Sequence, residues 1–222
     1  MRTRFLRPLT TSGATVLAAG SLLVATSGSA HADSTWSGTL TSAIAAVDTG
    51  TENRSGYTRE AFEHWVDADG DGCHTRAEVL IAEADDAPTV SSSCALSGGR
   101  WYSYYEGDSQ TSASDLDIDH MVPLAEAWDS GARTWPASRR EAFANDLGDP
   151  RSLVAVTASL NRSKGDRDVA EWLPPINECR YVKEWVATKL RWGLSADTAE
   201  IGALEDVAGG CTNSTITVTV VS

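Results

Sequence analysis

Alternating apolar and polar residues predict a β-strand at the start of the stretch LDIDHMVPLAEAWDSG. Leu116 and Ile118 are separated by acidic residues, so their side chains would share one face of an extended chain. A second apolar run, residues 152–157, predicts another strand, and residues 158–166 can begin a helix directly after it. We therefore expect strand, strand and helix in this order within residues 116–167.

The segments before this unit predict helices and short strands. Thr58 is expected to begin a helix that carries Trp65 on its apolar face, and residues 76–84 predict a second helix. Residues 91–114 are rich in Ser, Gly and Tyr, which favours short strands joined by loops. The mixture predicts an α+β fold in which a small ββα core, residues 116–167, is embedded among helices.

The first 32 residues have the pattern of a secretory signal peptide. Three arginines precede an apolar run, and Ala30-His31-Ala32 matches the small-x-small motif of a cleavage site. We predict a signal peptide in residues 1–32 and a single domain in residues 33–222. No later segment is apolar enough to span a bilayer, so we expect a secreted, extracellular protein that does not associate with membranes after cleavage.

Four cysteines follow the predicted signal peptide: Cys73, Cys94, Cys179 and Cys211. An even number in an exported chain favours two disulfides over free thiols. A zinc site is the weaker alternative, because the chain contains no CxxC pair. Proximity along the chain favours pairing Cys73 with Cys94 and Cys179 with Cys211.

The charge of the chain excludes one class of nucleic-acid-binding protein. At neutral pH its formal net charge is −13, so a broad basic surface that coats nucleic acid through its phosphates is not expected. A local basic patch remains compatible with brief contact between an enzyme and its substrate. Such a patch lies between residues 151 and 167 and consists of Arg151, Arg162, Lys164 and Arg167, with Asp166 as the one acidic residue among them.

The stretch DADGDGCHTRAE, residues 67–78, matches the spacing of a calcium-binding loop. The predicted ligands of a structural calcium ion are Asp67, Asp69, Asp71, Thr75 and Glu78. An alternative interpretation needs no cation, because Thr75 and Glu78 also have the spacing of a helix capping box. Repulsion among three aspartates within five residues favours the cation. We do not expect this loop to be the function of the protein.

Three separated motifs carry a family resemblance: DIDHMVPLAEAWDSG, FANDLGDPRSLVAVTASLNRSKGD, and EWLPP followed by CRYVKEW. From about Tyr57 to Cys211 the chain resembles the HNH (ββα-metal, His-Me finger) endonucleases, most closely the secreted bacterial branch related to the C-terminal nuclease domain of GmrSD-type restriction enzymes. One position departs from the family pattern. The middle residue of the HNH signature, which braces the loop around the catalytic histidine, is here Arg151 or Ser152 rather than Asn or His.

The resemblance implies a catalytic site for phosphodiester cleavage. His120 would be the general base, since a neutral imidazole accepts a proton near neutral pH. Asp119 and Asn161 would hold one divalent cation, and their oxygen ligands favour Mg²⁺ or Mn²⁺. Lys164 or Arg162 would bind a neighbouring phosphate of the substrate.

Two functions follow from these observations. The first is a secreted, metal-dependent endonuclease that hydrolyses DNA, with RNA as a further substrate, and acts as a monomer. The alternative is a noncatalytic, calcium-stabilised extracellular binding protein in which the nuclease motif has decayed. Incubating the protein with plasmid and magnesium, with and without a chelator, distinguishes them.

Overall fold

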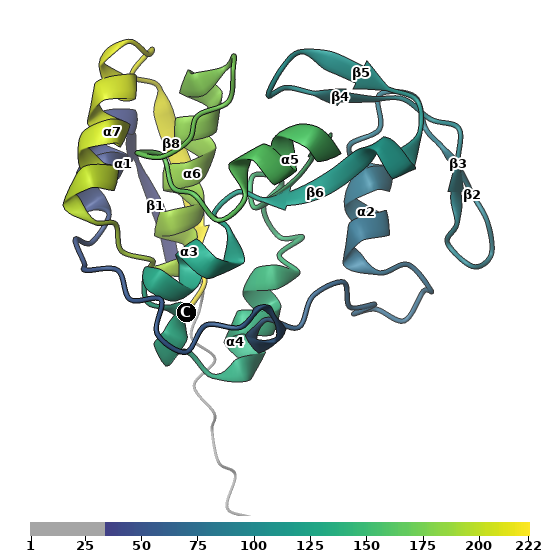
Figure 1. The fold of residues 1–222 in the computed structure, drawn as a ribbon, viewed down its shortest axis with the longest axis horizontal. Helices are drawn as coiled ribbons and strands as arrows, with labels where there is room; N and C mark the ends of the chain where they lie inside the picture. The colour runs from purple at the N-terminus through teal and green to yellow at the C-terminus, as the bar shows by residue number, and fades with distance from the viewer. Residues whose placement is uncertain (1–33) are drawn as a thin grey trace, which may run out of the picture. The chain divides into compact units, whose positions relative to one another are not determined.

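Short strands and helices alternate along the chain, which the computed structural model describes over residues 34–222; the predicted signal peptide lies outside the described residues. These residues fall in one compact unit (Figure 1). The strands are β1 (Ser34–Thr39), β2 (Thr89–Val90), β3 (Leu96–Ser97), β4 (Trp101–Ser103), β5 (Asp108–Gln110), β6 (Leu116–His120), β7 (Leu153–Thr157) and β8 (Thr215–Val220). The α-helices are α1 (Leu40–Ala46), α2 (Thr75–Ala82), α3 (Leu124–Asp129), α4 (Ala137–Ala144), α5 (Ala158–Lys164), α6 (Glu178–Trp192) and α7 (Thr198–Gly209). The fold is α+β, as the sequence predicts.

The expected strand, strand and helix form one unit. Strands β6 and β7 pair antiparallel with Asp119 opposite Val154 and His120 opposite Leu153. All five residues of β7 are buried, which explains its unbroken apolar sequence. Helix α5 begins directly after β7 and ends at Gly165, whose φ of 58° suits a residue without a Cβ. This connection lays α5 beside the end of β6 (Figure 1).

The two ends of the described chain pair with each other and pack on the longest helix. Strands β1 and β8 form an antiparallel ladder with Ser34 opposite Val220, and α6 packs against β8. Helix α6 contributes Tyr181, Trp185 and Trp192 to the main apolar core. The sequence predicted neither β1 nor α1 in this terminal segment, because its residues are mostly small and polar and carry a weak periodic signal.

The prediction of a helix beginning at Thr58 is wrong. The chain forms only a short 3₁₀ turn there, Arg59–Ala61, and Trp65 has a φ of 62°. The carbonyls that a helix would use are bound by distant side chains instead: Arg140 Nε donates to the oxygen of Ala61 at 2.9 Å, and Asn145 Nδ2 donates to the oxygen of Glu63 at 2.8 Å. Tertiary hydrogen bonds therefore override the local helical pattern.

Two disulfides join the pairs that proximity favoured. Cys73 bonds to Cys94 and Cys179 bonds to Cys211, and the described residues contain no free cysteine. The first disulfide links the acidic loop to the segment between β2 and β3. The second ties the beginning of α6 to Cys211, the second residue after α7, so both predictions of connectivity are confirmed. Within residues 34–222, none of the helices has the length and apolar character needed to cross a membrane.

Candidate active site

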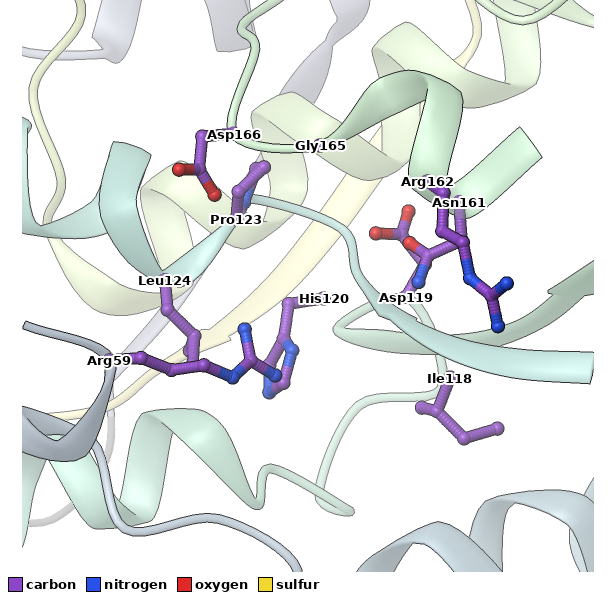
Figure 2. A pocket seen from close by; sticks show the side chains of 10 residues that line it. All are labelled: Arg59, Ile118, Asp119, His120, Pro123, Leu124, Asn161, Arg162, Gly165 and Asp166. Atoms are coloured by element: carbon purple, nitrogen blue, oxygen red, sulfur yellow. The ribbon is translucent and has the colours of Figure 1, made fainter. Parts of the chain in front are cut away.

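A pocket of about 220 Å³ opens where β6 ends and α5 passes beside it. Figure 2 shows the side chains around it. The lining residues are Arg59, Ile118, Asp119, His120, Pro123, Leu124, Asn161, Arg162, Gly165 and Asp166. Four of the five residues that the sequence assigned to catalysis or phosphate binding line this pocket, and Lys164 lies behind it. The fold thus brings the predicted β6 and α5 side chains together.

His120 is held as a neutral ring, and one of its nitrogens has no hydrogen bond to the described residues. It is buried, and its Nε2 donates to the carbonyl oxygen of Ala144 at 2.9 Å. Since a carbonyl can only accept, Nε2 carries the proton and Nδ1 is the basic nitrogen. The ring stacks on Trp65 with centroids 5.5 Å apart. Burial, together with the positive charge of Arg59, lowers the pKa of His120 to about 3. The imidazole is therefore unprotonated at neutral pH.

Asp119 and Lys164 form a buried ion pair. Lys164 Nζ lies 2.6 Å from Asp119 Oδ2 and also donates to the carbonyl oxygens of His120 and Met121 at 3.0 and 2.8 Å. The hydroxyl of Tyr105 donates to the same carboxylate oxygen. Burial raises the pKa of Asp119 and lowers that of Lys164, while their mutual contact opposes both shifts. The ammonium group thus holds the end of β6 against α5.

This position differs from the phosphate contact expected of Lys164. Its side chain is fully buried, whereas Arg162, two residues earlier on α5, is 76% exposed and lies 3.5 Å from Asp117. The alternation follows from helix geometry, since residues two apart point in different directions. Of the two candidates, only Arg162 has its cation at the surface, where it can reach a substrate phosphate.

Asp119 and Asn161 offer oxygen atoms to the pocket. Asp119 Oδ1 accepts no hydrogen bond from the described residues, because its contacts fall on Oδ2. Asn161 donates through Nδ2 to Asp117 at 3.3 Å, and none of the described residues donates to its own Oδ1. The two groups lie on the same side of the pocket in Figure 2. A carboxylate and an amide oxygen are hard ligands, so this pair suits Mg²⁺ or Mn²⁺.

Arg59 is a pocket residue that the sequence reading missed. It comes from the short turn after Thr58, far in sequence from the motifs that contain His120 and Asn161, and its exposed side chain lines the pocket beside His120. Its charge is among the causes that lower the pKa of His120. Arg59 and Arg162 place two cations around a site in a strongly acidic protein. No local sequence pattern marks Arg59, because its place in the pocket depends on how residues 58–62 fold back onto β6.

The loop before β7 is braced by a carboxylate. Asp146 accepts from Ser152 Oγ at 2.7 Å, from Arg191 Nε at 2.6 Å and from Trp192 Nε1 at 2.9 Å. These contacts tie the loop between α4 and β7 to α6. Because Ala144 belongs to the end of α4, the same bracing fixes the carbonyl that orients His120. Ser152 thus contributes to loop support through Asp146, without the Asn or His of the usual signature.

The acidic loop brings carboxylate oxygens close together, as a cation site requires. Oxygens of Asp67, Asp69 and Asp71 lie within 4.8 Å of one another. An oxygen of Glu78 lies within 4.8 Å of one of Asp71, and burial, followed by the charges of the three aspartates, raises the pKa of Glu78. Gly72 has a φ of 95°, which permits the sharp turn. Three of the five predicted calcium ligands therefore converge, and a fourth, Glu78, lies beside Asp71.

Thr75 does not join this group. Its hydroxyl donates to the carbonyl of Val66 at 3.0 Å and to Asn145 Oδ1 at 2.8 Å. The capping-box interpretation is also wrong, because the N-cap of α2 is His74, whose side chain accepts from the amide of Ala77. Thr75 is instead the first helical residue, and its side chain ties α2 to the end of α4.

The chain is similar to known proteins. Residues 79–206 match the family model described as GmrSD restriction endonucleases, C-terminal domain, a span that includes every pocket residue except Arg59. An "Uncharacterized secreted protein" of Arthroderma benhamiae is 42% identical over 160 residues, which cover 71% of this chain and 77% of that protein. This relative is fungal, so it does not support the expected bacterial branch. No solved structure matches the chain. The chain belongs to the family of the C-terminal domain of GmrSD restriction endonucleases.

Proposed function

We propose that this protein is a secreted, metal-dependent HNH-type endonuclease that hydrolyses phosphodiester bonds of DNA. One observation carries the proposal: the basic Nδ1 of a neutral, buried histidine lies in the same pocket as unengaged oxygens of Asp119 and Asn161. This is the combination that hydrolysis of a phosphodiester by water requires, namely a proton acceptor beside oxygen ligands for a cation. The family match supports a nuclease in general.

His120 is the proposed general base. Its Nδ1 takes a proton from the attacking water, and the imidazolium that forms is stabilised by the hydrogen bond from Nε2 to Ala144. The stacking of Trp65 and the Ala144 contact together fix the plane of the ring. Arg59 and Arg162 bind the phosphate at the pocket rim, where their charge opposes the negative charge that grows on its oxygens.

Asp119 and Asn161 are the proposed ligands of one Mg²⁺ or Mn²⁺ ion. Bound there, the ion would supply positive charge to the scissile phosphate and its leaving oxygen. Lys164 and Tyr105 both bind Oδ2 of Asp119, so the carboxylate has a fixed orientation with Oδ1 available. The buried ion pair therefore positions one ligand atom in advance of metal binding.

Secretion and the substrate rest on separate support. The predicted signal peptide, the two disulfides and the name of the fungal relative favour an extracellular protein. The family description names restriction endonucleases, which favours DNA. We also propose that the acidic loop binds structural calcium through Asp67, Asp69, Asp71 and Glu78, since their oxygens are the ligands that this ion prefers.

A nicking assay tests the proposed function. Purified mature protein is incubated with supercoiled plasmid or with RNA, in magnesium, manganese or EDTA, and compared with His120→Ala. A histidine outside the pocket, changed as His74→Ala, is the matched control. We expect plasmid cleavage that requires metal, is lost in His120→Ala and is retained in His74→Ala. Absence of cleavage on both substrates with either metal would support the noncatalytic binding protein instead.

A further inference from the structure

A tryptophan covers the proposed general base and has an unfavourable backbone conformation. Trp65 stacks on His120 with ring centroids 5.5 Å apart and an interplanar angle of 29°. Its side chain also packs against the second apolar cluster, which contains Ile118 and Leu153 of the β6–β7 pair. The φ of Trp65, 62°, lies in the left-handed region, where a bulky side chain is rarely found. Such a conformation persists only where neighbouring contacts impose it.

The side chain of Asn145 binds the backbone on both sides of Trp65. Its Nδ2 donates to the carbonyl oxygen of Glu63 at 2.8 Å, and its Oδ1 accepts from the amide of Val66 at 3.1 Å. In Figure 1 the segment that leads to α2 passes α4, and Asn145 is the residue that ends α4. One side chain thus fixes the chain before and after the tryptophan, so the backbone has little freedom to turn the indole away from His120.

Asn145 is itself held in one orientation by two further hydrogen bonds. Its Oδ1 also accepts from the hydroxyl of Thr75 at 2.8 Å, and its Nδ2 also donates to the carbonyl oxygen of Glu141 at 2.8 Å. An asparagine side chain offers two donor hydrogens and two acceptor lone pairs. The four hydrogen bonds of Asn145 therefore use its whole capacity, and they join α2, α4 and residues 63–66 at one point.

The residue before Asn145 restrains His120 in a second direction. The carbonyl oxygen of Ala144 accepts from His120 Nε2 at 2.9 Å. This hydrogen bond acts along the plane of the imidazole, whereas the stacked indole of Trp65 lies against its face. Two consecutive residues at the end of α4 thus restrain both the direction in which Nδ1 points and the tilt of the ring. Loss of the Asn145 side chain would remove the restraint on tilt and leave the Ala144 carbonyl in place.

We propose that Asn145 is a positioning residue for His120 and that it acts by fixing Trp65 against the imidazole. The inference rests on the proposed nuclease function, in which Nδ1 of His120 takes a proton from water. Proton transfer requires the base within hydrogen-bond reach of that water, and a misplacement of about 1 Å can lower a rate by about 100-fold. This role is separate from that of Asp146, because Asn145 acts on the segment before α2 rather than on the loop before β7.

A double-mutant cycle on kcat tests this relationship. Asn145→Ala and Trp65→Leu should each lower kcat by roughly 10- to 100-fold, with little change in KM, because other residues make the proposed phosphate contacts. If Asn145 acts through Trp65, the double variant should be no slower than Trp65→Leu, whereas independent effects would multiply. Trp65→Phe keeps an aromatic ring and should retain most of the rate. Asn213→Ala, the control, removes an asparagine that is hydrogen-bonded to Thr41 outside the pocket and should keep the wild-type kcat.

Proton NMR at constant pH, without metal or substrate, measures the position of His120 directly. The ring current of the stacked indole moves the proton signals of the imidazole upfield, and folded Asn145→Ala should lose this shift while Asn213→Ala keeps it. If the wild-type protein cleaves no nucleic acid, the nuclease proposal fails, yet the NMR shift still shows whether Asn145 positions His120. An unchanged shift in Asn145→Ala, or multiplied effects in the double variant, would overturn the proposal. So would a wild-type kcat in Trp65→Leu, which keeps every hydrogen bond of Asn145 and so does not depend on how well Asn145→Ala folds.

Discussion

Lys164 and Asp119 meet at 2.6 Å inside the protein, and both side chains are almost completely shielded from water. The residue expected to bind substrate is thus part of the support for a proposed metal ligand. Because Lys164 also binds two carbonyl oxygens at the end of β6, it couples the position of α5 to that of the strand. Asn161 lies one helical turn earlier on α5, so the same contact sets the distance between the two proposed ligands.

Lys164→Met should therefore destabilise the fold. It leaves a buried carboxylate without its cation, which typically costs roughly 3–5 kcal/mol of unfolding free energy. Arg162→Met, which removes an exposed cation from the same helix, should change stability by less than about 0.5 kcal/mol. Denaturant unfolding measures both values. Equal, small effects would contradict the structural role given to Lys164.

In DNA binding, Arg162→Met should have a larger effect than Lys164→Met. Arg162→Met should weaken binding and reduce its salt dependence, since a phosphate contact contributes by releasing counterions. Binding is measured at several salt concentrations in EDTA, which prevents cleavage. An unchanged salt slope in Arg162→Met would exclude Arg162 from phosphate binding.

His120→Ala should lower the cleavage rate about 100-fold or more while the metal requirement stays the same. The reason is that His120 is the proposed proton acceptor, whereas Asp119 is a proposed ligand of the cation. Asn161→Ala is the contrasting variant, and part of its lost rate should return when magnesium is raised. Metal titrations of the cleavage rate give both results. Recovery of His120→Ala by metal would remove His120 from the base role.

The lowered pKa of His120 predicts that the stability of the protein depends on pH in the acidic range. An unfolded chain protonates this histidine near its ordinary value of 6.5, whereas burial delays protonation in the folded chain to about pH 3. Between these values the unfolded state binds more protons, so stability is lost as pH falls from 6.5 towards 3, by up to about 1.4 kcal/mol per pH unit. Unfolding of His120→Gln across this range should show a shallower loss than wild type.

The same pKa changes the expected pH dependence of activity. A base with an ordinary imidazole pKa would lose activity as pH falls through 6.5. The ring stays neutral down to about pH 3 in the free enzyme. Protonation of His120 should therefore cause no fall in kcat/KM near pH 6.5, and any fall seen there should remain in His120→Ala. Rates at subsaturating substrate between pH 5 and 8 measure this. A step of that kind would show that His120 is more exposed in solution.

The sequence could predict those parts of the site that depend on the order of neighbouring strands and helices along the chain. Asp119 and His120 end one strand, Asn161 lies on the helix after the next, and antiparallel pairing brings them together. The roles of Lys164 and Arg162 could not be separated, because the side of a helix that faces the core depends on how it packs. Arg59, Tyr105 and the Ala144 carbonyl reach the site from distant segments, and no local pattern marks them.

The error at Thr58 has the same origin. The apolar spacing of Phe62 and Trp65 fits a helix, yet Phe62 packs in the main core while Trp65 stacks on His120. Asn145 accepts from the amide of Val66 and donates to the carbonyl of Glu63. Side chains that arrive from α4 thus decide the backbone path, and their effect cannot be read from the local sequence.

The disulfide between Cys179 and Cys211 should contribute substantially to stability. It closes a loop with a sequence separation of 32 residues, which in the chain-entropy model corresponds to roughly 3–4 kcal/mol. Cys179→Ser with Cys211→Ser should lower the unfolding free energy by this amount without removing metal-dependent cleavage, because neither residue lines the pocket. Unfolding in denaturant and the nicking assay measure the two properties. Loss of cleavage in a folded double variant would contradict this separation.

The acidic loop gives a final test, because two of its predicted ligands differ in the structure. The carboxylate of Asp69 lies among the oxygens of the loop, whereas the hydroxyl of Thr75 is used by Val66 and Asn145. Asp69→Ala should abolish the rise of Tm in calcium. Thr75→Val should lower Tm in EDTA, since it removes the hydrogen bonds of the hydroxyl to Val66 and Asn145 at a cost of about 1 kcal/mol, yet it should keep the calcium shift. Calcium-dependent unfolding of the two variants measures this difference. If Thr75→Val lost the shift and Asp69→Ala kept it, the cation would not lie among the aspartates.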